Sequence, residues 1–180
     1  DSLPVYFQSD KYDEEILVLK FKLEGDGTPQ NTIQLYKRLA EIYQAKGMEG
    51  NAKEYFLKSL ESAEQIDDMS EMAWLNAQIG HIIRLGNVLD DYKKYYQNAV
   101  NFFEFCEKPM CKFESNYIQA LLSNDDIESL DLLLKAENIL LEQLADNSEN
   151  PKVWEALGRL YNQQAAYIQN EDQKLAKYQL

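Results

Sequence analysis

The sequence predicts an all-α protein built from stacked pairs of antiparallel helices, and three observations favour this fold class. Only 7 of the 180 residues are Gly and 4 are Pro, which leaves few turn signals for a fold with many β-strands. Residues that favour helices recur at helical spacing along the chain, and 45% of all residues are hydrophobic, enough for a continuous core. The first half also repeats itself with a period of about 40 residues, which is typical of stacked arrays.

Charge and hydropathy exclude several classes of partner. The formal net charge is −13, from 31 Asp and Glu against 18 Lys and Arg, so the chain repels the phosphates through which nucleic acids are bound. The longest apolar runs, ILVL and LLL, are far shorter than the roughly 20 residues of a membrane-spanning helix. We therefore expect a soluble chain with no nucleic-acid partner and no membrane insertion. The start, DSLPVYFQ, lacks an initiator Met and a signal peptide, which suggests a cut or processed end and leaves the compartment open, with the cytoplasm slightly favoured.

Residues 1–30 are expected to form a separate N-terminal segment, and two patterns overlap within residues 13–24. The alternation of apolar and polar residues in LVLKFKL is typical of a β-strand. Three other features fit a helix instead: an acidic start, Leu19 and Leu23 one turn apart, and Gly25 at the end. Because a single strand has no sheet to pair with in a helical array, helix is favoured, either as a cap or as the second helix of an earlier unit.

Residues 31–180 are expected to form a helical repeat domain, because signals that begin and end helices divide them at intervals. Gly47 and Gly86 end helices, pairs of aspartates cap helix starts, and Pro151 suits a first helical turn. The predicted helices span about 31–46, 50–66, 71–85, 90–106, 112–123, 126–145 and 151–168, and an eighth begins near Asp172 after the connection QQAAYIQNED. Paired, they give units at about 32–66, 72–106, 110–145 and 151–180, the last one truncated.

The strongest repeat signal is an arrangement of large and small residues on the two helices of the first unit. A small residue between large ones lets a neighbouring backbone come close while the large side chains fill the space around it. The first helix supplies Tyr36, Leu39, Ala40 and Tyr43, and the second supplies Ala52, Phe56 and Ser59. The first-helix pattern returns near the end of the chain as Trp154, Leu157, Gly158 and Tyr161.

These patterns resemble the tetratricopeptide repeat family over about residues 32–180, most closely in the first unit and at residues 151–161. The period of about 40 resembles the longer variants found in kinesin light chains and in bacterial peptide-sensing regulators of the Rap type. The resemblance implies a right-handed superhelix of helix pairs whose first helices line a concave groove. Rings such as Tyr36, Phe56 and Trp154 are expected to be buried between neighbouring units, and Gly158 to admit a partner helix.

The sequence offers no convergent set of catalytic or metal-binding residues. It has no phosphate-binding glycine loop and no nucleophile elbow, and His81 is its single histidine. The aspartate pairs lie where helix starts need caps, which favours a structural role over acid–base catalysis. Cys106 and Cys111 cannot complete a zinc site without carboxylates, and they are either two small apolar residues or a local disulfide. We therefore expect no enzyme activity, no metal and no cofactor.

The predicted groove is lined by side chains on the first helix of each unit. In the second unit, Trp74, His81 and Arg84 combine ring area with charge, the properties that dominate binding energy at interfaces. Structural roles stay open, with Trp74 in the core, His81 half-buried and hydrogen-bonded, and the arginines in solvated ion pairs. The predicted partner-binding residues are Lys37, Glu41, Trp74, His81, Arg84, Ile118, Arg159 and Asn162.

The function predicted from this groove is a non-catalytic module that docks another protein or a peptide. A clamp for a C-terminal carboxylate, as in chaperone-binding members of the family, is excluded because Lys37 fits but Glu41 stands where an Asn is required. The alternative is a sensor segment of a larger signalling protein that responds to a peptide or an effector domain. Self-association of the array is a third hypothesis, which light scattering can test.

Overall fold

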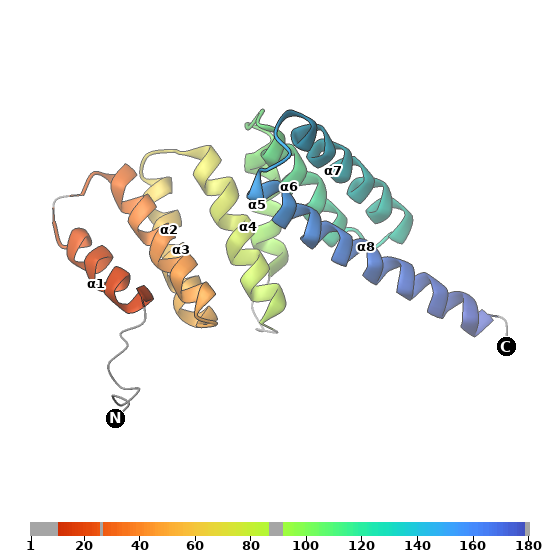
Figure 1. Cartoon of the computed structure of the whole chain (residues 1–180), viewed down its shortest axis with the longest axis horizontal. Coiled ribbons are helices and arrows are strands. Elements are labelled where there is room, and N and C mark those ends of the chain that lie inside the picture. The colour runs from red at the N-terminus through yellow and green to blue at the C-terminus, as the bar shows by residue number, and fades with distance from the viewer. Residues whose placement is uncertain (1–10, 26, 87–91, 179–180) are drawn as a thin grey trace, which may run out of the picture. The chain divides into compact units, whose positions relative to one another are not determined.

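Eight helices form the regular structure of the residues that this computed structural model describes, which are 11–25, 27–86 and 92–178, with side chains described as far as residue 169 (Figure 1). No strand occurs among them, so the predicted all-α class is confirmed and the helical alternative for residues 13–24 is correct. None of the described helices combines the length and the apolar character that a membrane span requires. The chain divides into two compact units, one ending at Tyr95 and one beginning at Tyr96.

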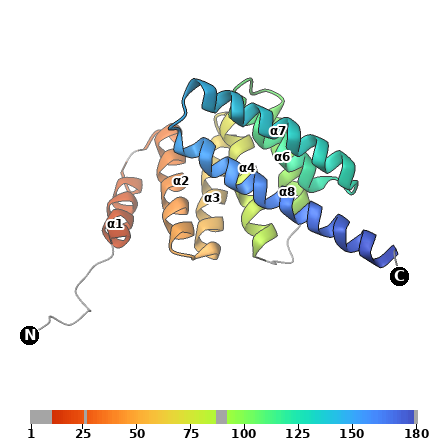
Figure 2. The same cartoon turned by 45° about the vertical axis from the view of Figure 1, so that its right-hand side comes forward.

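Four complete helices lie in the described part of the N-terminal unit, and they pack in chain order, each against the next (Figures 1 and 2). Short turns join them, so successive helices run in opposite directions. The last three lie within two residues of the predicted boundaries, because caps and turn residues specify where they begin and end. The helices are α1 (Lys11–Leu23), α2 (Pro29–Ala45), α3 (Glu49–Glu64) and α4 (Met69–Leu85).

The core of this unit is centred where α2 crosses α3, and residues of the repeat pattern fill it. Ala40, Ala52 and Phe56 are fully buried, since small residues let the two backbones approach and the ring fills the space beside them. Ser59 is fully buried as well, and its hydroxyl donates a hydrogen bond to the backbone oxygen of Ile33 at 3.0 Å. This bond satisfies the buried hydroxyl and accounts for a serine in the core.

Aromatic contacts show which face of α2 is covered by α3. Tyr55 of α3 stacks on Tyr43 with ring centroids 5.4 Å apart, and its centroid lies 6.1 Å from that of Tyr36. Tyr36, Ala40 and Tyr43 lie on one stripe of α2, because they are separated by about one helical turn each. The second helix of this pair therefore covers the stripe that carries the small residue.

Two aspartates begin helices as the sequence predicts. The Asp68 carboxylate accepts a hydrogen bond from the backbone N–H of Glu71 at 3.1 Å in the first turn of α4. The Asp125 carboxylate accepts one from the N–H of Ile127 at 2.9 Å at the start of the seventh helix. Both caps satisfy amide groups that a helix start leaves without partners. The third predicted cap, at residues 90–91, lies outside the described residues.

The C-terminal unit contains most of the fifth helix and three further helices. In both views α7 and α8 lie side by side, and α7 also packs against α6 (Figures 1 and 2). Fully buried large side chains of this unit include Tyr96, Phe113, Leu133 and Leu140. The helices are α5 (Tyr92–Phe103, whose first turn belongs to the N-terminal unit), α6 (Pro109–Leu122), α7 (Asp126–Asp146) and α8 (Pro151–Tyr178).

A disulfide joins Cys106 and Cys111 between the end of α5 and the first turn of α6. Of the two alternatives for these cysteines, the local disulfide is therefore correct. Pro109 occupies the first turn of α6, where its missing N–H leaves no helical hydrogen bond unmade. The bond closes the short connection CEKPMC and restricts how α5 and α6 can separate.

The last helix differs from the prediction in length. α8 runs without a break from Pro151 to Tyr178, so the predicted connection QQAAYIQNED and the eighth repeat helix near Asp172 are wrong. The segment from residue 159 onwards contains neither Gly nor Pro and is rich in Gln, Ala, Leu and Lys. These residues favour helix, and nothing in the segment ends one.

The buried face of α8 also differs from the prediction. Val153, Ala156, Leu157 and Leu160 are buried, whereas 55% of Trp154 is exposed. Tyr161 is 46% exposed, and a Cβ added to Gly158 would meet no atom within 4 Å. The expected burial of Trp154 between units and the expected close approach at Gly158 are therefore wrong. The buried stripe precedes the predicted one by about one residue, which turns the rings to solvent.

Two glycine substitutions are expected to change stability in opposite directions. Gly47 has φ of 70° and ends α2, where the N–H of Met48 donates to the Tyr43 oxygen at 2.8 Å. Gly47→Ala should lower the free energy of unfolding by about 1 kcal/mol, because L-residues rarely adopt this conformation. Gly158→Ala should raise it by about 0.5 to 1 kcal/mol, because alanine favours an exposed helix interior.

Urea unfolding followed by circular dichroism measures both glycine variants. A loss of stability in Gly158→Ala would contradict the open environment described for this residue.

Candidate functional site

The first helices of the predicted repeats in the N-terminal unit, α2 and α4, meet along a row of polar side chains. The side chains of α2 that take part recur at positions 30, 34 and 37, and those of α4 at positions 68, 71 and 74, so each set lies on one stripe. Gln30 Nε2 donates to Asp68 Oδ2 at 3.5 Å, Gln34 Nε2 donates to Glu71 Oε1 at 3.3 Å, and Lys37 Nζ donates to Glu71 Oε2 at 2.7 Å. We call the exposed surface along these two stripes the α2–α4 face.

Lys37 and Trp74, two of the predicted site residues, lie together at the centre of this row. The Lys37 ammonium is 4.3 Å from the centroid of the Trp74 ring, a cation–π arrangement. The Trp74 ring also packs edge-on against Phe56, with centroids 5.7 Å apart. Trp74 is only partly buried, so it borders the core and contributes to the surface at once. The sequence had presented these two roles as alternatives.

Glu41, His81 and Arg84 lie further along the same two helices. Glu41 is exposed on α2 one turn after Lys37, and its carboxylate lies 3.5 Å from the Arg38 guanidinium. His81 and Arg84 are half-buried on α4, and each has interaction partners. Five of the eight predicted residues thus belong to α2 and α4 of a single unit.

Arg159, a predicted site residue of the C-terminal unit, forms an ion pair between α6 and α8. Its Nη2 atom lies 2.5 Å from Glu114 Oε1, and the Glu114 side chain is only 8% exposed. The guanidinium carbon is 5.6 Å from the Phe113 ring centroid and 5.5 Å from that of Tyr117. Burial lowers the pKa of Arg159, but Coulombic attraction to Glu114 and the hydrogen bond that the guanidinium donates to Glu114 outweigh burial, so the net pKa is raised. Arg159 therefore holds α8 on α6 rather than standing free for a partner.

Two other predicted residues of this unit have different environments. Ile118 has no exposed surface and belongs to the core, so its expected place on an exposed groove is wrong. Its neighbour Tyr117 is buried too, and the Arg159 guanidinium of α8 lies over its ring. Asn162 is exposed on α8, as expected.

Sequence reasoning missed the carboxylate that Lys37 binds. Glu71 stands three residues before Trp74 on the same stripe of α4, and this spacing was the available signal. Its partner lies on another helix, 34 residues earlier in the chain. Spacing within one helix specifies a face but not the residue that faces it across the contact.

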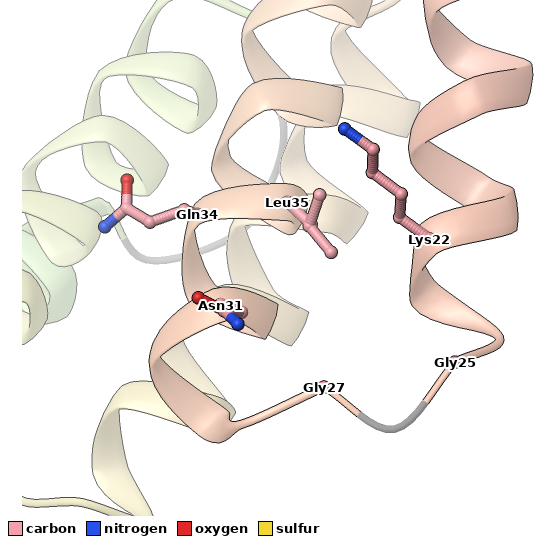
Figure 3. A pocket seen from close by; sticks show the side chains of 6 residues that line it. All are labelled: Lys22, Gly25, Gly27, Asn31, Gln34 and Leu35. Atoms are coloured by element: carbon pink, nitrogen blue, oxygen red, sulfur yellow. The ribbon is translucent and has the colours of Figure 1, made fainter.

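A hollow of about 360 Å³ lies between the end of α1 and the start of α2 (Figure 3). Lys22 extends from α1 and Leu35 lies across from it on α2. Lys22 is the single ionisable side chain among the described lining residues, so this hollow offers no pair of groups for acid–base chemistry. Its lining residues are Lys22, Gly25, Gly27, Asn31, Gln34 and Leu35.

Comparison of the chain with protein-family models, with curated proteins and with solved structures finds no match in any of the three. A functional assignment must therefore come from the chain's own residues. Among the described residues, no three His, Cys, Asp or Glu side chains are grouped so that they could hold a metal ion. The α2–α4 face, with its partly exposed tryptophan, is the candidate site that the geometry favours.

Proposed function

We propose that this chain is a non-catalytic docking module of the tetratricopeptide type, a right-handed superhelix of helix pairs that binds another protein or a peptide. The observation that carries the proposal is the cluster of Lys37, Glu71 and Trp74 on the α2–α4 face. A tryptophan held by its core contact with Phe56 presents a rigid ring to a partner at little entropic cost.

The exposed residues around this cluster suit an extended polypeptide. Gln34, Glu41 and Gln44 are exposed on one stripe of α2, and they offer both donors and acceptors to a peptide backbone. Further along α4, His81 adds an imidazole and Arg84 adds a positive charge. Asn162 is proposed as a separate contribution of the C-terminal unit, whereas Arg159 is bound by Glu114 and Ile118 is buried, so neither belongs to the proposed surface.

A charge exchange on this face tests the proposal. The double variant Glu41→Lys, Arg84→Glu keeps the net charge and leaves Trp74 in place, while it reverses one charge on α2 and one on α4. We expect affinity capture from the native source to lose at least one protein that the wild type retains, measured by quantitative mass spectrometry.

The matched control is Glu61→Lys with Lys112→Glu, another charge exchange at exposed positions outside this face. It should capture the same proteins as the wild type. If the double variant on the α2–α4 face and the control retain the same set as the wild type, the partner does not bind there.

A further inference from the structure

Exposed apolar side chains form a strip over α7 and α8 that neither the docking face nor the core uses. Trp154 is 55%, Leu134 54% and Ile168 55% exposed, and Leu141 and Tyr161 are each 46% exposed. Single exposed apolar residues are common on proteins, but five on two adjacent helices mark a surface for a partner. We call these five residues the α7–α8 strip.

Hydrogen bonds show that the two helices contribute to one continuous surface. The Tyr161 hydroxyl donates to Glu137 Oε1 at 2.8 Å, and Gln164 Nε2 donates to Glu137 Oε2 at 3.2 Å. Glu137 lies on α7 three residues after Leu134 and four before Leu141, so these leucines flank it on the same stripe. Tyr161 is therefore held beside the exposed leucines of α7.

The same chain shows what covers such a face when it is occupied. Trp154, Gly158 and Tyr161 have the spacing of Tyr36, Ala40 and Tyr43 on α2. On α2, the small residue has no exposed surface and Tyr43 is 8% exposed, because α3 lies against them. On α8, the position of the small residue is open to solvent. The geometry thus fits an antiparallel helix.

The helix that occupies this geometry on α2 has a recognisable pattern. Its buried residues include Ala52, Phe56 and Ser59, a small residue followed four positions later by a large one and after three more by another small one. Tyr55 of the same helix supplies the ring that stacks on the aromatic residues of α2. A partner helix with this pattern would place a small residue over Gly158 and an aromatic ring beside Tyr161.

Charge selects between a second copy of this chain and a different partner. The Glu137 carboxylate lies on the α7–α8 strip, Glu142 and Glu155 directly follow Leu141 and Trp154 in the sequence, and the whole chain has a net charge of −13. Two copies would therefore bring like charges together, whereas a basic helix would be attracted. We propose that the α7–α8 strip binds, from a separate polypeptide, a basic amphipathic helix with the small–large–small pattern of α3.

The test uses a synthetic peptide derived from α3. Its sequence is that of residues 49–64 with the four glutamates Glu49, Glu54, Glu61 and Glu64 replaced by lysine, and a hydrocarbon staple on its outer face keeps it helical. Fluorescence anisotropy with the full chain should show saturable binding that weakens as salt is added. The same peptide with the original glutamates should bind with an affinity at least about tenfold lower.

Two glycine variants locate the binding site. Gly158→Leu fills the open position on α8 and should weaken binding by about tenfold or more. Gly50→Leu makes the same change on α3, where an added Cβ also meets no atom within 4 Å, and should bind like the wild type. Both variants place leucine in an exposed helix, so neither is expected to unfold the chain.

Three results would overturn the proposal. One is that the wild type does not bind the basic peptide. Another is that Gly158→Leu binds the peptide as tightly as Gly50→Leu does. Alternatively, light scattering would show a dimer of the free chain that Gly158→Leu converts to a monomer, which would make a second copy the occupant. None of these results depends on whether the α2–α4 face binds a peptide.

Discussion

Replacing Phe56 with alanine is expected to lower the free energy of unfolding of the N-terminal unit by about 3 to 5 kcal/mol. Phe56 has no exposed surface, and its ring packs against Trp74, so one side chain joins the α2–α3 pair to α4. Truncation removes the apolar surface and leaves a cavity that the neighbouring helices cannot fill without moving.

Urea unfolding monitored by tryptophan fluorescence in a Trp154→Phe background measures this effect, because Trp74 then reports on the N-terminal unit. Phe21→Ala is the matched control, since Phe21 is 76% exposed and its truncation should change stability by less than about 0.5 kcal/mol. Equal losses in the two variants would show that Phe56 does not hold the α2–α3 pair to α4.

The second large effect is expected at the ion pair of Arg159 and Glu114. Arg159→Met keeps much of the side-chain volume but leaves the Glu114 carboxylate in a buried site without its guanidinium. Removing one partner of a buried pair costs about 3 to 5 kcal/mol, and we expect the lower end because the Arg159 side chain is 33% exposed. Thermal and urea unfolding of the C-terminal unit would measure the loss.

Two comparisons separate this effect from packing. The double variant Glu114→Leu, Arg159→Met removes both charges and should recover most of the lost stability. Lys135→Met breaks the exposed ion pair between Lys135 and Asp131, whose two side chains are 59% and 61% exposed, respectively. This change should lower the free energy of unfolding by less than about 1 kcal/mol. If Lys135→Met costs as much as Arg159→Met, burial of the Glu114–Arg159 pair is not what stabilises α8 on α6.

The positions of the helices could be predicted from sequence because their signals are local. Gly47 ends α2 in a left-handed conformation, and Asp68 and Asp125 cap the helices that follow them. The core of the first pair could be predicted for a related reason, since Ala40 and Phe56 follow helical spacing on two neighbouring helices. In this part of the chain, the helix-ending signals and the packing of neighbouring helices indicate the same helix pair.

The buried face of α8 could not be predicted, because the helix carries two apolar stripes. One contains Val153 and Leu160, and the other contains Trp154 and Tyr161. On α2 the corresponding second stripe is buried only because α3 lies against it. Periodicity shows that a stripe can be buried but not whether a neighbouring helix is present to bury it.

Only part of the candidate site could be predicted, because helical spacing shows which residues share a face but not whether that face is exposed. Spacing placed Lys37 and Trp74 on stripes of two first helices, and the structure brings them together. The same spacing placed Ile118 on an exposed face, although the structure buries it. Which side of a helix remains exposed depends on contacts with helices that are distant in sequence.

On α2 the following helix covers the small residue Ala40, and on α6 the small residue Ala120 is fully buried where the Ser129 hydroxyl of α7 donates to its backbone oxygen at 3.0 Å. The equivalent position on α8, Gly158, is open. Three variants, each with one introduced cysteine, test this difference: Ala40→Cys, Ala120→Cys and Gly158→Cys. The native cysteines form a disulfide and do not compete for a thiol reagent under oxidising conditions. Circular dichroism and light scattering would establish that each variant is folded and monomeric before labelling.

The labelling rate of each thiol in the native protein, relative to its rate in urea, is the decisive measurement. The account predicts that Cys at position 158 reacts almost as fast as in the unfolded chain, while the probes at 40 and 120 react only as fast as their helices open. Protection of position 158 in a monomer, or free reaction at position 40, would contradict it.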